Sequence, residues 1–207
     1  MKNNNKIILL MLILTLIILF AGYMIIQSQN NTNNSYKNLH LSVNMPIDDN
    51  DEYTKNLIKD ISSYIEENRW GYISGSGPMY YQSLKSSYDI YINIQKDYVT
   101  KFRDYLNKYE LARGSYLEVE NKRVEEYGKL YGFMISYDNR KIDFSNIDAE
   151  ITSLLGEKLK QKFEYIYDNK KYVYYYSEDK NTLESNIREY ISGKKLTSDV
   201  LILQTSK

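Results

Sequence analysis

The chain has 207 residues, with 27 basic and 27 acidic side chains, one histidine and no cysteine. A neutral chain favours neither nucleic acid nor an anionic lipid surface as a partner. Without cysteine there are no disulfide bonds and no cysteine-ligated metals, so the fold has to rest on its hydrophobic core. The composition is rich in tyrosine, with 23 residues, and rich in asparagine and lysine, a bias that indicates an AT-rich bacterial gene.

Near the amino terminus, residues 7–26 read IILLMLILTLIILFAGYMII, without a charge or a proline. A helix of that length spans a bilayer core of about 30 Å. Lys2 and Lys6 precede the segment, and no charge follows it before Lys37. The positive-inside bias therefore predicts a cytoplasmic segment 1–6, a transmembrane signal anchor and a single-pass cell-membrane protein with its remaining domain outside.

A cleaved signal peptide is the alternative for the same segment. The apolar block is longer than the roughly 7–15 residues typical of such peptides, and Ala21-Gly22-Tyr23 is a poor cleavage site. A retained anchor is therefore favoured. Residues 27–38, QSQNNTNNSYKN, are polar and without periodicity, which predicts a flexible linker.

From residue 39 to residue 121, the alternation of apolar and polar residues predicts strands, and apolar residues three or four apart predict helices. Strand patterns occur at 39–45, 88–94 and 116–119, and an interrupted strand containing two glycines and a proline occurs at 72–81. Helical faces run through 57–65, after an acidic start at 48–52, and through 98–109.

From residue 122 to residue 207, the same kinds of pattern recur. They predict a connector helix through Val124, Tyr127 and Leu130, a strand at 130–137, a helix from Ser145, a hairpin over 163–176, a helix ended by Gly193 and a strand at 200–203. Residues 88–120 superpose on 172–204 without a gap. The predicted fold class is therefore α+β, with the transmembrane helix followed by two tandem ferredoxin-like (βαββαβ) units, 39–121 and 122–207, related by internal duplication.

Three features carry potential chemistry, and each has a simpler interpretation. His40 has no cysteine and no second histidine with which to form a zinc site or a serine-type triad, which favours an ordinary strand residue. The cluster 48–52 fails the EF-hand pattern, since Tyr53 stands where a glycine is needed. Gly75 and Gly77 lack the lysine of a phosphate loop, so a turn or bulge with positive φ is predicted there. We expect no catalytic, cofactor-binding or metal-binding residues.

Tyrosine repeats on two neighbouring strands of the predicted hairpin, at 172, 174 and 176 and, with Phe163, at 165 and 167. If these rings lie on the open face of a sheet, Tyr165, Tyr174 and Tyr176 form a platform for a protein partner. The alternative, which the tyrosine bias favours, is that the two units pack together and bury the rings.

The leading functional prediction is a membrane-anchored, extracytoplasmic, non-catalytic protein that recognises another protein, as an accessory, inhibitor or immunity-type factor. One alternative is a hydrolase of an envelope polymer that uses carboxylates such as Asp89, Glu118 or Glu120, because paired acids can cleave glycosides. Another is a structural subunit of a membrane complex. Nucleic acid is not expected as a partner, and the sequence leaves the oligomeric state open.

Overall fold

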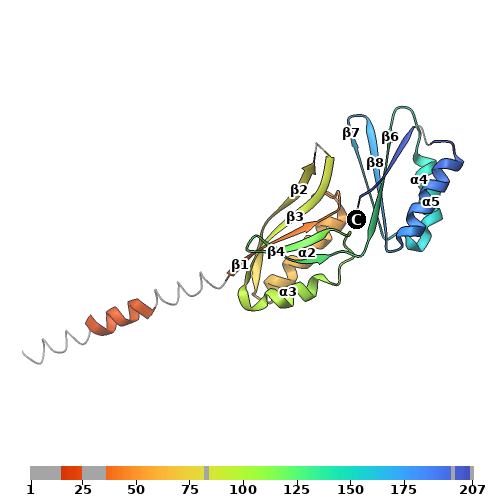
Figure 1. The fold of residues 1–207 in the computed structure, drawn as a ribbon. Helices are drawn as coiled ribbons and strands as arrows, with labels where there is room; N and C mark the ends of the chain where they lie inside the picture. Colours follow the sequence, from red (N-terminus) through yellow and green to blue (C-terminus); the bar gives the residue numbers. More distant parts are fainter. Residues whose placement is uncertain (1–14, 25–35, 82–83, 197–198, 206–207) are drawn as a thin grey trace, which may run out of the picture.

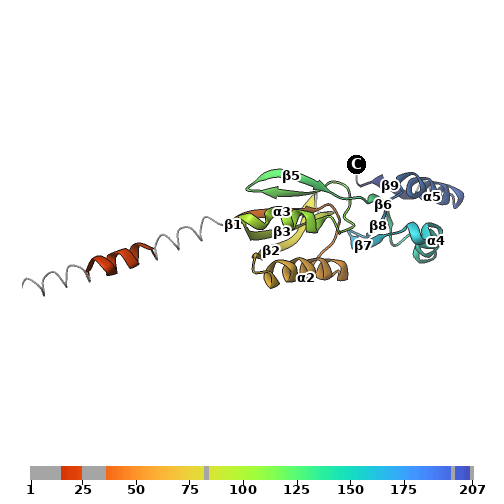
Figure 2. The same ribbon diagram turned by 90° about the horizontal axis from the view of Figure 1, so that it is seen from below.

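The computed structural model describes residues 15–24, 36–81, 84–196 and 199–205 (Figure 1). The described residues form a mixed α+β chain with two antiparallel sheets. We call the part from β1 to β5 the first lobe and the part from β6 to β9 the second lobe. Figures 1 and 2 show the two lobes side by side.

The predicted transmembrane helix at the amino terminus is wrong, and this changes both the predicted fold class and the predicted localisation. The described part of the segment is a helix over residues 15–24, which covers about 15 Å at 1.5 Å per residue. Among the described residues, no helix has both the length and the apolar character needed to cross a bilayer. The transmembrane helix, the signal anchor and the single-pass membrane localisation are therefore contradicted. The rest of the predicted span, 7–14 and 25–26, lies outside the described residues, as do 1–6 and most of the predicted linker.

The first lobe carries a five-stranded sheet in the order β2-β3-β1-β4-β5, so β1 and β3 are central. Without β5, this is the strand order of a split βαβ arrangement. Its elements are β1 (Tyr36–Val43), α2 (Glu52–Glu67), β2 (Gly71–Tyr81), β3 (Leu84–Gln95), the 3-10 helix η1 (Lys96–Tyr98), α3 (Val99–Leu106), β4 (Ser115–Val119) and β5 (Lys122–Tyr127).

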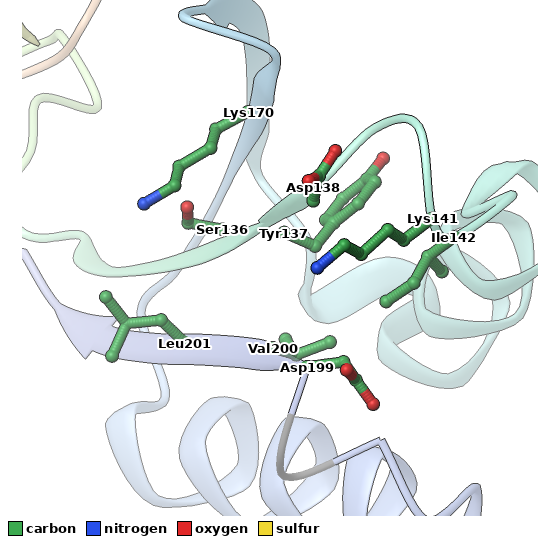
Figure 3. Close-up of a pocket in the computed structure, with 9 residues that line it drawn as sticks. All are labelled: Ser136, Tyr137, Asp138, Lys141, Ile142, Lys170, Asp199, Val200 and Leu201. Atoms are coloured by element: carbon green, nitrogen blue, oxygen red, sulfur yellow. The ribbon is translucent and has the colours of Figure 1, made fainter.

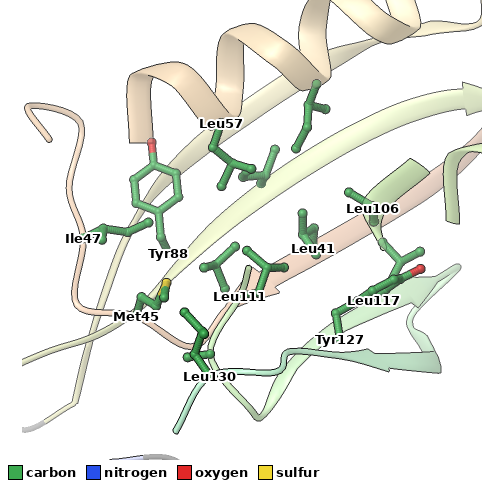
Figure 4. Close-up of a cluster of buried hydrophobic side chains, with 14 of the residues drawn as sticks. Leu41, Met45, Ile47, Leu57, Tyr88, Leu106, Leu111, Leu117, Tyr127 and Leu130 are labelled. Carbon is green, nitrogen blue, oxygen red and sulfur yellow. The ribbon is translucent and has the colours of Figure 1, made fainter. Parts of the chain in front are cut away.

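One face of the first sheet is covered by α2 and α3. Strand alternation sends Leu39, Leu41 and Val43 to that face, where they meet the apolar stripe of α2 and Phe102 of α3. Figure 4 shows side chains of this cluster between α2 and the sheet. The ones labelled there are Leu41, Met45, Ile47, Leu57, Tyr88, Leu106, Leu111, Leu117, Tyr127 and Leu130.

The predicted connector helix is instead strand β5. Glu120 and Asn121 have φ of 53° and 62°, the left-handed pair that a two-residue hairpin turn requires. The turn folds β5 back on β4, where Tyr127 pairs with Ser115 and is buried. Val124, which the helical reading placed on the buried face, is exposed. The spacing of three apolar residues was therefore misleading here.

The second lobe carries a four-stranded sheet in the order β7-β8-β6-β9. Its connectivity is strand, helix, two strands, helix and strand, the same order as β1 to β4. The elements are β6 (Tyr131–Asp138), α4 (Ser145–Leu155), the 3-10 helix η2 (Gly156–Lys158), β7 (Gln161–Tyr167), β8 (Lys170–Ser177), α5 (Lys180–Gly193) and β9 (Val200–Gln204). That the two lobes arose by duplication stays a prediction.

The second sheet is covered on both faces, by different parts of the chain. Helices α4 and α5 bury one face around Phe133, Ile135 and Tyr175, and Figure 1 shows both helices on the side away from the first lobe. The opposite face contributes Phe163 to the same buried cluster as the core of the first lobe. There the ring of Tyr53 meets Phe163 edge to face, with centroids 5.7 Å apart. The lobes therefore share a continuous core.

Candidate functional site

The predicted tyrosine platform lies in the contact between the lobes. Tyr174 and Tyr176 are 5% and 1% exposed and belong to the shared core. Tyr165 is partly buried, with its hydroxyl 3.2 Å from that of Tyr174 and the Lys85 ammonium 5.3 Å from its ring centroid. Burial raises the pKa of the Tyr174 and Tyr176 phenols above the ordinary value. Of the two readings of these rings, the structure shows the intramolecular one for Tyr174 and Tyr176.

The first sheet, in contrast, has an accessible face on the side away from α2 and α3, which we call the open face. Cross-strand register decides which residues share it, because paired residues point to the same side of a sheet. His40 of β1 pairs with Tyr91 of β3 and with Glu118 of β4. Ser42, two residues along, pairs with Asp89. Chemistry-bearing side chains from three strands therefore meet on this face.

At its centre, His40 lies between two carboxylates. His40 Nε2 is 3.0 Å from Asp89 Oδ2, and His40 Nδ1 is 3.2 Å from Glu118 Oε2. The Asp89 side chain is only 8% exposed, and a buried carboxylate is costly unless it is paired. Only the Nδ1–Glu118 contact is a hydrogen bond, whereas His40 Nε2 and Asp89 Oδ1 are buried without a hydrogen-bond partner among the described residues. These contacts bring β1, β3 and β4 together around the His40 ring.

Aromatic rings surround this acid–histidine–acid group. The Tyr91 ring stacks on His40, with centroids 4.9 Å apart and planes 10° apart, and Tyr116 meets it edge-on at 5.9 Å. The guanidinium of Arg123 lies over Tyr116, 4.3 Å from the ring centroid. Partial burial, with the nearby Asp89 charge, raises the pKa of the Tyr91 phenol. The rings and charges are therefore held in place by one another.

Large parts of the same face are accessible. Tyr72 and Tyr91 are 51% and 46% exposed, and Tyr36 at the start of β1 is also exposed. Beside them, β2 contributes Gly75 opposite Tyr91 and Gly77 opposite Asp89. A Cβ atom added to either glycine would meet nothing within 4 Å, so the surface over this strand is unobstructed. The predicted bulge occurs between Ile73 and Gly75, without the positive φ that we expected.

The geometry does not resemble that of a catalytic base. In a serine-type triad one imidazole nitrogen faces the acid and the other faces the nucleophile. Here both nitrogens of His40 lie within 3.2 Å of carboxylate oxygens, which is not the arrangement of such a triad. A glycosidase needs two carboxyl groups on either side of a substrate, whereas Asp89 and Glu118 have His40 between them. Glu120, the third predicted acid, accepts from the Asn38 backbone N–H at 3.0 Å.

Three cavities of the described residues lie elsewhere. One of about 460 Å³ is at the start of β9, where Figure 3 shows Lys141, Lys170 and Asp199 around it. A second, also about 460 Å³, runs along α2, and a third of about 750 Å³ lies between the β4–β5 hairpin and Thr205. None of the three is lined by His40, Asp89 or Glu118. Within the described residues, no three His, Cys, Asp or Glu side chains are grouped to hold a metal ion.

The acidic cluster 48–52 is occupied by contacts within the protein. Asp48 forms an ion pair with Lys85, which lowers the pKa of that carboxyl. Asp49 accepts from the Tyr88 hydroxyl at 2.5 Å, and Asp51 accepts from the Asp48 backbone N–H at 2.7 Å. These bonds fix the chain between β1 and α2, next to the contact with the second lobe.

Sequence reasoning named Asp89 and Glu118 but did not bring them together around His40. It also placed Tyr88, Ile90, Ile92 and Ile94 on one face of a strand without considering the other face, which carries Asp89 and Tyr91. The alternation of residues along the strand was the available signal, because Asp89 and Tyr91 must lie on the face opposite to the apolar one. Which strands lie beside it is not readable from that pattern.

No known protein family matches the sequence, and no characterised protein is detectably similar to it. Among solved structures, a putative glycine cleavage system transcriptional repressor matches with 7% identity and a TM-score of 0.29, covering 82% of this chain and 98% of that one. The first two RRM domains of yeast poly(U)-binding protein match with 10% identity and a TM-score of 0.29, covering 82% and 99%. A protein from Bacteroides thetaiotaomicron matches with 12% identity and a TM-score of 0.25, covering 82% and 92%. Similarities this low carry no argument about function.

Proposed function

We propose that the chain is a non-catalytic binding module that recognises another protein through the open face of its first sheet. The observation that carries the proposal is the group of exposed tyrosines around His40, Glu118 and the buried Asp89. Tyrosine supplies a large, rigid and amphipathic contact area, and binding energy in protein interfaces concentrates on such residues. The stacking of Tyr91 on His40 orders that ring in advance, which reduces the entropy lost on binding.

The charges of the face indicate the kind of partner. Asp89, Glu118 and Glu126 lie on it, and Arg123 supplies a guanidinium beside them. The Arg123 guanidinium is already 2.9 Å from Glu126 and lies over Tyr116. Three carboxylates against one guanidinium, together with the exposed ring faces, favour a partner segment that presents arginine or lysine. The same carboxylates repel phosphate, which disfavours nucleic acid on this face.

The proposal is tested by photo-crosslinking in the source cells. A photoreactive phenylalanine analogue is placed at Tyr72 and, in a second strain, at Tyr167, which is 45% exposed on the edge strand of the second lobe. We expect a discrete crosslinked protein from position 72 and none, or much less, from position 167. Equal crosslinking from the two positions would mean that the open face is not the binding surface.

A second variant tests the same proposal by blocking the open face with a bulky side chain. Gly75→Trp adds bulk beside Tyr91 where a Cβ meets no neighbour, so the fold should tolerate it while a partner should not. The crosslink from position 72 should therefore be lost in the Gly75→Trp background. If it persists undiminished although the bulky ring is present, the partner does not cover this face.

A further inference from the structure

Strand β9 differs from the other edge strands of the two sheets. It pairs with β6 on one side only, and its sequence from Val200 to Leu203 is VLIL, without a charge or a proline. Figure 2 shows it on the outer side of the second sheet. Exposed sheet edges are normally protected against pairing with another chain by charges, proline or bulges.

The three other edges carry such protection. Edge strand β2 contains Pro78 and two register shifts, β5 reads KRVEEY, and β7 carries Lys162 and Glu164. In contrast, β9 exposes Leu201 and Leu203, which are 55% and 46% exposed on the face of the sheet away from α4 and α5. Large apolar side chains on an unprotected edge are the features of a strand that receives another strand.

The backbone of β9 presents its hydrogen-bonding groups outward at Ile202. Thr205 donates its N–H to the Gly132 carbonyl at 2.9 Å, so Thr205, Leu203 and Leu201 direct their backbone groups toward β6. The alternation of an antiparallel ladder then directs those of Ile202 away from β6, to the free edge.

We infer that β9 pairs antiparallel with β9 of a second copy of the chain, about a two-fold axis at Ile202. The sequence is self-complementary in this register. Ile202 would exchange both backbone bonds with its own copy, and Leu201 would lie opposite Leu203 of the second copy, which brings apolar side chains together on the exposed face. No charge faces a like charge anywhere along Val200 to Gln204. The two four-stranded sheets become one continuous sheet.

The register makes a specific disulfide prediction, because the protein has no cysteine of its own. Residues 201 and 203 of opposite copies form a non-hydrogen-bonded pair, whose Cα separation of about 4.5 Å suits a disulfide bond. Leu201→Cys and Leu203→Cys are introduced into two separately tagged full-length chains, mixed and oxidised. Leu154→Cys, at an exposed position on α4, serves as the collision control.

We expect mixed dimers of the Leu201→Cys and Leu203→Cys chains to form at least fivefold faster than dimers of either chain alone or of the Leu154→Cys chain. Adding Ile202→Pro, which removes the outward N–H but no bond to β6, should abolish that preference, whereas Ile202→Ala should retain it. The inference is overturned if the mixture crosslinks no faster than the single variants, a result that does not depend on whether Ile202→Pro folds.

Discussion

Replacing Tyr176 with alanine tests whether the two lobes share one core. Tyr176 is 1% exposed, and its ring lies 6.0 Å from that of Phe163, which in turn meets Tyr53 of the first lobe. A buried tyrosine removes roughly 200 Å² from water, so about 25 cal/mol per Å² sets an upper limit of about 5 kcal/mol. Removing large buried aromatics typically costs about 3–5 kcal/mol, and we expect a loss of free energy of unfolding in that range.

Guanidinium denaturation of the full chain measures the effect with two probes. Far-UV circular dichroism reports both lobes, whereas the fluorescence of Trp70, the one tryptophan, reports the first lobe, where it stacks on Tyr98 with centroids 4.6 Å apart. Both probes should shift together in Tyr176→Ala. Tyr167→Ala, at an exposed position on β7, should change the stability by less than about 0.5 kcal/mol. A cost below about 1 kcal/mol for Tyr176→Ala, or an unshifted Trp70 transition, would refute the shared core.

Three further outcomes are expected, two in the same denaturation assay and one by titration. Phe102→Ala, at a fully buried position on α3, should cost about 3–5 kcal/mol, and a cost below about 1 kcal/mol would mean that the α3 core is misplaced. Gly132→Ala should destabilise the fold by about 1–3 kcal/mol, because its Cβ would overlap the side chains of Thr205 and Tyr176. Gly77→Ala, whose Cβ meets no atom within 4 Å, should change stability by less than about 0.5 kcal/mol. Equal effects of the two substitutions would contradict this packing. Burial and the bond to Asp49 raise the pKa of Tyr88 to about 12, so its contribution to stability is complete below the unfolded pKa of about 10 and is lost as the pH rises to about 12. Absorbance titration should show that pKa fall toward 10 in Asp49→Asn, and an unchanged value would exclude the proposed contact.

Local signals in the sequence were sufficient for most helices and for one hairpin. The apolar face through Leu57, Ile61 and Ile65 became α2, and Gly193 ends α5. Asp168 and Asn169 adopt φ of 47° and 60°, as a two-residue hairpin turn between β7 and β8 requires. These features depend on neighbours within a few residues, which a pattern can represent.

The errors come from features that a local pattern does not determine. Glu120 and Asn121 form a turn of the same kind, but the spacing of Val124, Tyr127 and Leu130 predicts a helix where the chain forms β5. The site on the open face depends on β1 pairing with both β3 and β4, which joins His40 to residues far along the chain. Whether Tyr174 faces a partner or the other lobe depends on how the lobes pack, and the sequence pattern of β7 and β8 does not determine that packing.

The central claim is that a protein partner binds the open face of the first sheet, and its affinity for matched variants tests this most directly. The partner identified by crosslinking is purified, and its affinity for each variant is measured by calorimetric titration. The Tyr72→Ala and Gly75→Trp chains should bind it about fivefold or more weakly, a loss of about 1 kcal/mol, while Tyr167→Ala binds as the unmodified chain does. The free energies of unfolding of all four chains should agree to within about 0.5 kcal/mol. Equal affinities for all four chains, with stability unchanged, would contradict the claim.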